Sequence, residues 1–314
     1  MQSKFTKYEF SILSIVLVSY FMTVLDVSVV ITALPKIQTD LNLSTANLTW
    51  VQNAYTIIFG GLLLLGGRLG DIIGRKHVFN FGLVIFGLGS LLVGLANSPM
   101  WLIIARGFQG AGAAALAPST LALLMDSIPA GEKRIRAVAD YGAVAGIGAS
   151  LGLVIGGLFA SLLSWRYAFF VNVPIAIVMF IWATKAVRSS RSQKGSFDGI
   201  GSLLSLLGMI SLVYGILLVS ESSTAWDWII AAVILLGLFI WREAKVAQPI
   251  MPLRVFKNSE RAGAYLARML FLGAMMAFWF FITQFLQEVY GFSPLMAGLG
   301  FFPMTIANFI SALQ

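Results

Sequence analysis

The chain has 314 residues, of which 59% are hydrophobic and only 11% are charged, and its formal net charge is +8. Soluble domains carry about 25% charged residues, so this composition argues against a soluble protein and for a chain that lies in lipid. The sequence contains no cysteine and a single histidine, His77. We therefore expect no disulfide, no metal site and no cofactor. The positive charge fits basic loops beside anionic lipid better than it fits nucleic acid.

Ten apolar segments are predicted to cross the membrane as helices. A spanning helix needs about 20 residues to cross about 30 Å of hydrocarbon, and in lipid its backbone groups must pair within the segment. The first segment continues to Pro35 without a cleavage site, so it is predicted to be a retained helix rather than a signal peptide. The ten spans are expected at 11–34, 48–67, 78–96, 101–124, 137–161, 167–187, 198–219, 228–242, 262–287 and 295–314.

Basic residues are distributed unevenly between the two sides of this layout. With the N-terminus inside, 17 of the 21 basic residues fall in inside segments, only Lys36 and Arg166 fall outside, and Arg106 and Arg268 lie within spans. Positively charged loops remain on the cytoplasmic side. The pattern predicts a multi-pass protein of the inner (plasma) membrane with a cytoplasmic N-terminus.

Asp26 and Arg106 lie within the first and fourth predicted spans. A charge at the bilayer centre costs about 2.5–3.5 kcal/mol on insertion scales, so such residues usually serve a function. Burial favours a neutral Asp26 and a nearby cation favours a charged one, a balance that suits proton coupling. The alternatives are a structural carboxylate and, for Arg106, a side chain that snorkels to the interface. The coupling hypothesis requires Asp26 to reach a central cavity.

Glycines recur every four residues in the fifth span, at Gly148, Gly152 and Gly156, and Gly157 follows directly. Such a stripe lets a second helix pack closely or slide. The Gly156–Gly157 pair also weakens the helix locally, which leaves open a hinge. Close static packing is the simpler interpretation.

The segment 67–76 is predicted to be a loop between the second and third spans, with glycines that permit a tight reversal. It sets one acid among three basic residues and is either a cytoplasmic gate or an ordinary basic loop. Phosphate binding is poorly supported, because the pattern G-x-x-x-x-G-K-[ST] is absent. The candidate gate residues are Gly67, Asp71, Gly74, Arg75 and Lys76.

These motifs resemble those of the major facilitator superfamily. Segment 67–76 is similar to its G-x-L-a-D-r-x-G-r-k/r signature, and the run 106–112 resembles its fourth-helix motif, whose arginine is implicated in proton coupling. The run 148–157 resembles its antiporter motif, with Leu153 in place of the proline. Three further segments resemble the 14-helix drug–proton antiporter family: 25–35, 165–174 and 249–254.

The resemblance implies an all-α integral membrane fold, with about ten transmembrane helices present of a probable fourteen, and hence a truncated chain. It divides the chain into a six-helix bundle, an inserted helix pair, a cytoplasmic connection and two helices of an incomplete second bundle. The corresponding ranges are 1–187, 188–242, 243–261 and 262–314.

The resemblance further implies a secondary transporter that exports small amphipathic or cationic compounds, such as drugs, antiseptics and antibiotics, by proton antiport and alternating access. Asp26 would exchange a proton for substrate, Arg106 would tune its proton affinity, and Asp71 with Arg75 would hold the gate. The expected partners are the substrate, protons and lipid, and the chain is expected to be a monomer. Four alternatives stay open: a metabolite importer, a facilitator, a membrane sensor without flux and a nonfunctional fragment. The sequence shows no nucleophile–base pair and no metal cluster of the kind that enzymes use, so we do not expect the chain to be an enzyme.

Overall fold

A computed structural model describes residues 5–188, 198–219, 222–304 and 306–307, except for the side chains of residues 45 and 46. Within these ranges the regular structure is helical, with one short 3₁₀ turn, η1 (Leu253–Phe256). The helices are α1 (Lys7–Leu41), α2 (Thr45–Ile73), α3 (Arg75–Gly94), α4 (Pro99–Ser127), α5 (Glu132–Leu162), α6 (Trp165–Phe170), α7 (Asn172–Ala186), α8 (Gly199–Leu218), α9 (Ala225–Lys245), α10 (Ser259–Glu288) and α11 (Pro294–Gly300).

Nine segments of the described chain are long and apolar enough to cross a membrane, with α6 and α7 counted as one. They coincide with the first nine predicted spans, which confirms their positions. The tenth prediction, 295–314, corresponds to α11 and a shorter apolar stretch, Pro294–Met304. The remainder of that span lies largely outside the described residues.

The predicted loop at 67–76 is wrong, because α2 continues through Ile73 and α3 begins at Arg75. The reversal takes place at Gly74 alone, whose φ of 97° lies in the region that favours glycine. Helix continues through Gly67 and Gly70 while α2 packs closely on α4, where a Cβ on the neighbouring Gly66 would lie 3.2 Å from the Ala115 Cα. Tertiary packing therefore outweighs the low helix propensity of glycine.

Two further boundaries differ from the prediction. The first helix passes through Pro35 and ends at Leu41, where Asn42 adopts a left-handed conformation. The sixth predicted span is divided at Val171 into α6 and α7. This division places the start of α7, with the polar residue Asn172, inside the apolar region.

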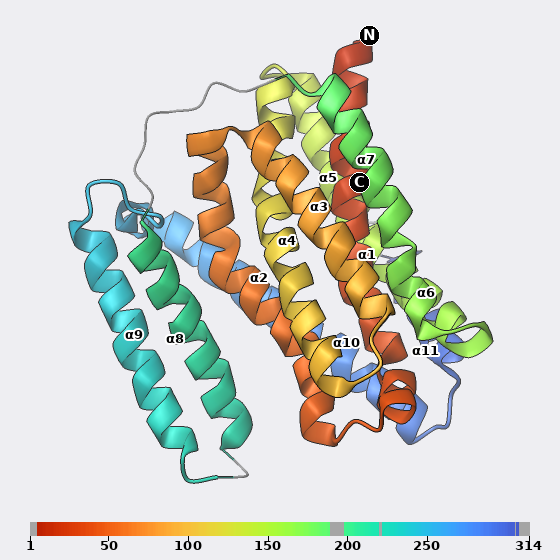
Figure 1. Cartoon of the computed structure of the whole chain (residues 1–314). Coiled ribbons are helices and arrows are strands. Elements are labelled where there is room, and N and C mark those ends of the chain that lie inside the picture. Colours follow the sequence, from red (N-terminus) through yellow and green to blue (C-terminus); the bar gives the residue numbers. More distant parts are fainter. Residues whose placement is uncertain (1–4, 189–197, 220–221, 305, 308–314) are drawn as a thin grey trace.

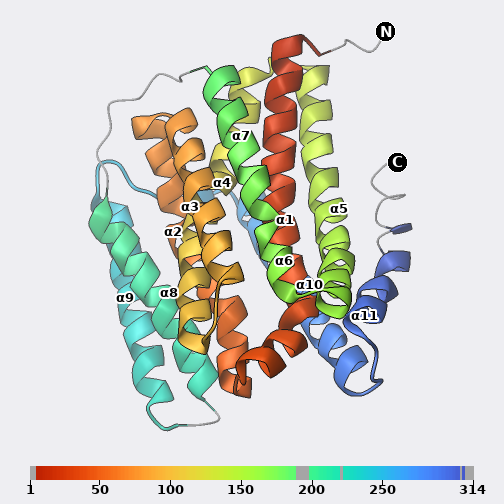
Figure 2. The same ribbon diagram turned by 45° about the vertical axis from the view of Figure 1, so that its right-hand side comes forward.

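Helices α1 to α7 form one packed group, in which the most extensive contacts join α2 to α4, α3 to α4 and α1 to α5. Figure 1 shows α8 and α9 as a separate pair beside this group, and α8 packs on α2. Helix α10 runs obliquely from that pair towards α11, which packs on α5. In Figure 2 the N-terminal end of α1 lies at the same end of the molecule as the α2–α3 and α4–α5 junctions. The alternating direction of the first five predicted spans is thus confirmed.

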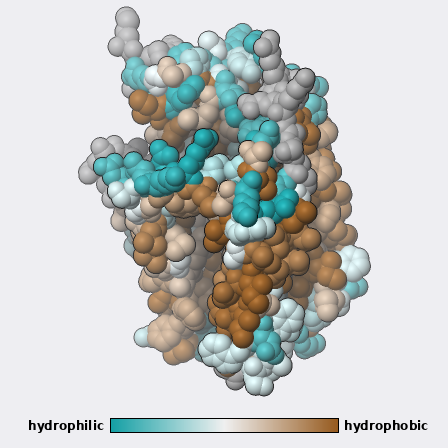
Figure 3. Space-filling model, turned by 90° about the vertical axis from the view of Figure 1, so that its left-hand side faces the viewer, coloured by the Kyte–Doolittle hydropathy of each residue, from teal (hydrophilic) through white to brown (hydrophobic). Residues whose placement is uncertain are grey.

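The face that carries α8 and α9 exposes many large apolar side chains. Figure 3 shows a broad hydrophobic surface beside a zone of hydrophilic residues at one end of the molecule. Val233 is 66% exposed and Trp241 57%, and Lys245 lies 4.6 Å from the centre of the Trp241 ring. An apolar surface of this extent, bordered by an aromatic and a basic side chain, is what a lipid-facing helix requires.

Candidate functional site

Asp26 of α1 and Arg106 of α4 form an ion pair in the interior of the helical group. Arg106 Nη1 lies 2.8 Å from Asp26 Oδ2, and both side chains are fully buried. The Arg106 Nε donates to the Val51 carbonyl at 3.1 Å, and the guanidinium lies 4.4 Å from the Tyr55 ring centre. The two candidate residues therefore lie in direct contact, and their role in proton coupling stays a prediction. The snorkelling alternative is wrong, because the guanidinium bonds to groups inside the protein rather than reaching the interface.

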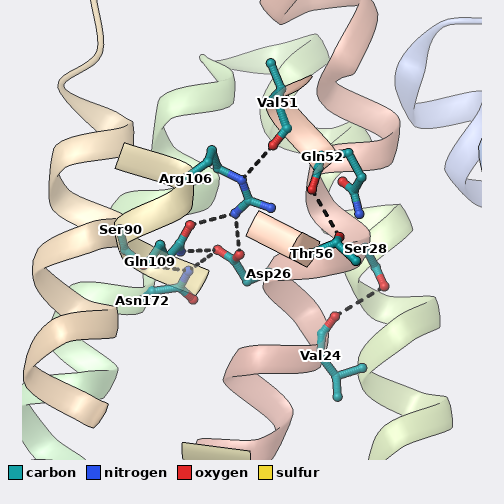
Figure 4. Close-up of polar contacts among 10 residues, drawn as sticks. All are labelled: Val24, Asp26, Ser28, Val51, Gln52, Thr56, Ser90, Arg106, Gln109 and Asn172. Carbon is teal, nitrogen blue, oxygen red and sulfur yellow. Dashed lines mark hydrogen bonds and ion pairs between the residues drawn. The ribbon is translucent and has the colours of Figure 1, made fainter. Parts of the chain in front are cut away.

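Two side-chain amides and one hydroxyl complete the network around Asp26 (Figure 4). Gln109 Nε2 and Asn172 Nδ2 each donate to Asp26 Oδ1 at 2.8 Å. Both amides also donate to Ser90 Oγ, Gln109 Nε2 at 2.7 Å and Asn172 Nδ2 at 3.3 Å. Gln109 Oε1 accepts from Arg106 Nη1 at 2.6 Å. All three groups that contact Asp26 are donors, so the arrangement suits an ionised carboxylate.

The local sequence explains how Gln109, Asn172 and Ser90 reach the carboxylate. Gln109 follows Arg106 by three residues, which places both on one face of α4. Asn172 begins α7 directly after the break at Val171. Ser90 follows Gly89, where a Cβ would lie 2.6 Å from the Gln109 Cα, so α3 and α4 approach closely.

These three residues were not predicted as part of the site from the sequence. Gln109 lies in the Arg106 motif, and Asn172 is a polar residue within an apolar span, so both carried a signal. Ser90 carried none, because serine is common in membrane helices.

No side chain of this network reaches solvent in the described arrangement, since Asp26, Ser90, Arg106, Gln109 and Asn172 are all 0% exposed. The requirement that Asp26 reach a central cavity is therefore not met in this arrangement. The coupling hypothesis in the form predicted from the sequence, in which Asp26 itself exchanges a proton for substrate, is not supported. Three buried atoms of the site lack a partner among the described residues: Arg106 Nη2, Gln52 Oε1 and Asn172 Oδ1. Figure 4 shows Gln52 on the side of Arg106 that faces away from Asn172.

The glycines of the fifth span make close helix contacts. Added Cβ atoms at Gly148, Gly152 and Gly156 would lie 3.2, 2.7 and 2.5 Å from side chains of α1. A Cβ at Gly157 would instead meet the Pro294 carbonyl at the start of α11. Helix α5 runs unbroken from Glu132 to Leu162. The glycine stripe thus packs α5 on α1 and, through Gly157, on α11.

The candidate gate residues contact neighbouring helices of the same group. Arg75 forms an ion pair with Asp126 of α4, donates to the Ala122 carbonyl at 3.1 Å and lies 3.4 Å from Asp71. Lys76 Nζ donates to the Thr184 carbonyl of α7 at 2.8 Å. Gly67 packs near Pro118 of α4, and Gly74 forms the turn. In the described residues these contacts fasten the end of α2 and the start of α3 to α4 and α7.

Long apolar helices, a buried intramembrane ion pair and glycine-mediated helix contacts define a multi-pass membrane protein of the transporter class. The chain belongs to the Major Facilitator Superfamily, whose family model matches residues 16–313. This family points to a non-enzymatic transporter.

Several curated proteins are similar to nearly the whole chain. It is 39% identical over 306 residues to the cephamycin export protein CmcT of Amycolatopsis lactamdurans, covering 94% of this chain and 63% of that protein. It is 38% identical over 294 residues to the uncharacterized MFS-type transporter EfpA of Mycobacterium tuberculosis, a match that covers 91% of this chain and 54% of that protein. It is 37% identical over 299 residues to the puromycin resistance protein pur8 of Streptomyces alboniger, covering 93% and 59%. The chain thus spans about half to two thirds of the length of these relatives.

A solved structure supports the fold. The POT family transporter PepTSo matches with a TM-score of 0.57 at 15% identity, over 76% of this chain and 52% of that one. At this identity the match concerns the arrangement of helices alone.

Proposed function

We propose that the protein exports small amphipathic compounds across the plasma membrane in exchange for protons. The observation that carries the proposal is the likeness, over more than nine tenths of this chain, to proteins named for the export of cephamycin and for resistance to puromycin. The apolar interior supports lipophilic substrates, because few polar groups are available to select a particular chemistry. The N-terminus lies in the cytoplasm, consistent with the basic residues of the inside segments.

The ion pair between Asp26 and Arg106 is the proposed coupling element. In the described arrangement Asp26 is held by three donors, and Arg106 donates to Asp26, Gln109 Oε1 and the Val51 carbonyl. A proton on Asp26 removes the charge that binds Arg106 and leaves a donor facing donors. The network then rearranges, and this rearrangement favours the alternative position of the bundles. Asp26 acts through this network rather than by binding substrate.

A route for the proton starts at the unpartnered side of Arg106. Arg106 Nη2 and Gln52 Oε1 are both buried, and a water between them would satisfy both. Gln52 is half-buried. Thr56, one turn further along α2, is exposed and donates to the main-chain carbonyl of Gln52 at 3.1 Å. This face of α2 is the proposed entry path.

The division of labour among the helices follows from the same proposal. The group 1–187 rocks against a second group that begins at 262, and α8 and α9 remain fixed to α2. The segment 67–76, which Arg75 joins to α4, stiffens the cytoplasmic side of the first group. The protein works as a monomer.

The proposal is tested with inverted membrane vesicles that contain the chain, or the complete reading frame where that is longer. Puromycin uptake is measured after a proton gradient is imposed. Asp26→Asn should abolish gradient-driven uptake, whereas Asp227→Asn, an exposed carboxylate of α9, should retain it. Gradient-driven uptake in Asp26→Asn at the wild-type rate would remove Asp26 from the mechanism. Wild-type uptake that is unaffected by collapse of the gradient would indicate a facilitator.

A further inference from the structure

Helix α10 carries a row of side chains with polar groups, called here the polar stripe, on the one face of the helix that is buried. Trp279, Thr283 and Gln287 are spaced by four residues and therefore share one face. Trp279 is 4% exposed and Thr283 is 0% exposed, whereas most of α10 is exposed. Trp279 Nε1, Thr283 Oγ1 and the neighbouring Gln284 Oε1 are buried and have no hydrogen-bond partner among the described residues.

The stripe lies in the seam between α10 and the first helical group. Trp279 belongs to a buried apolar cluster that includes Ile31 of α1 and Leu153 of α5. Gln287 Nε2 donates to the Thr32 carbonyl of α1 at a long 3.4 Å. Among the described residues, the buried polar atoms of Trp279, Thr283 and Gln284 thus have no hydrogen bond, and the half-buried Gln287 makes one long bond across the seam.

Such burial destabilises the closed seam. A buried polar group without a partner costs about 1–3 kcal/mol, and phenylalanine and valine would fill the positions of Trp279 and Thr283 without that cost. Groups that gain nothing while the seam is closed are the ones expected to act when it opens. In a transporter with alternating access, the seam between the two halves is the surface that opens to substrate.

We propose that Trp279, Thr283 and Gln284 form a hydrogen-bonding subsite for the uncharged polar groups of an amphipathic substrate. The indole N–H donates, the threonine hydroxyl donates or accepts, and the glutamine carbonyl accepts. The stripe itself carries no charge, so it selects carbonyl, ether and hydroxyl groups rather than a cationic centre. This inference rests on the proposed function and adds to it a substrate preference.

Binding of two probes to the purified protein tests the subsite. Puromycin carries carbonyl, ether and hydroxyl oxygens, whereas tetraphenylphosphonium is a lipophilic cation without hydrogen-bonding groups. Trp279→Phe and Thr283→Val should each weaken puromycin binding about three- to tenfold, the effect of one lost hydrogen bond. Tetraphenylphosphonium binding should change less than twofold. Thr283→Ser should retain wild-type affinity for puromycin.

A matched control is Trp226→Phe in α9, whose side chain is 63% exposed and away from the seam. It should alter neither affinity. Equal weakening for both probes would assign the stripe to packing alone and overturn the inference. Unchanged puromycin affinity in the variants would also overturn it, as would the absence of puromycin binding by the wild type. If the probes bind as expected but vesicles show no gradient-driven uptake, the subsite stands and the proposed function falls.

Discussion

The buried pair of Asp26 and Arg106 predicts a large and non-additive effect on stability. Asp26 accepts hydrogen bonds of 2.8 Å from Arg106, Gln109 and Asn172, and no part of the network is exposed. Asp26→Asn would leave Arg106 as an uncompensated buried charge and would turn a new N–H₂ donor towards existing donors. Removing one partner of a buried pair costs about 3–5 kcal/mol, and Arg106→Gln should cost a similar amount. The double variant removes both charges, so we expect a coupling energy of about 2–3 kcal/mol.

The measurement is reversible unfolding in mixed micelles with increasing dodecyl sulfate, for the wild type, the two single variants and the double variant. The exposed pair Lys36–Asp40, at 3.6 Å, provides a control cycle with an expected coupling below about 1 kcal/mol. Free energies of unfolding for Asp26→Asn and Arg106→Gln that add to within about 0.5 kcal/mol would refute the reasoning. The two residues would then be energetically independent despite their contact.

Two glycines give further predictions. A Cβ on Gly152 would lie 2.7 Å from the Ser28 Cβ and 2.8 Å from a backbone oxygen of α1, so Gly152→Ala should force α5 from α1 and lower the unfolding free energy by about 1–3 kcal/mol. Gly142→Ala has nothing within 4 Å and serves as the control, so an equal loss there would contradict the packing argument. Gly74→Ala places a side chain at φ 97° and should cost about 1–2 kcal/mol in the same assay. Gly70→Ala, inside α2, should be neutral or stabilising, and a loss as large as that at Gly74 would show that position 74 is not special.

The architecture was largely predictable from the sequence, because lipid imposes a strict rule. A run of about 20 apolar residues can satisfy its backbone only as a helix, so nine spans could be located without knowledge of their neighbours. Boundaries were less predictable. The continuation of α2 through Gly67 and Gly70 depends on its contact with α4, and such contacts between distant segments leave no trace in local composition.

The site was partly predictable for a similar reason. Asp26 and Arg106 were identified because charge inside a span is costly, and the same cost explains why they pair. Their enclosure was only partly predictable. Gln109 and Asn172 carry a signal as polar residues within apolar spans, but the sequence does not show that they and Ser90 meet at Asp26 from three different helices. The enclosure changes the interpretation of Asp26 from a substrate ligand to part of an internal network. The unpartnered atoms of α10 were equally hidden, since only the packed seam reveals that they are buried.

The turn at Gly74 has a mechanical consequence. A single residue between two long helices provides no slack, and Arg75, the first residue of α3, is fastened at once to α4 through Asp126 and the Ala122 carbonyl. We therefore expect helices α2, α3 and α4 to move as one unit. If the proposed transport cycle takes place, spin labels on the three helices should report the same angular displacement.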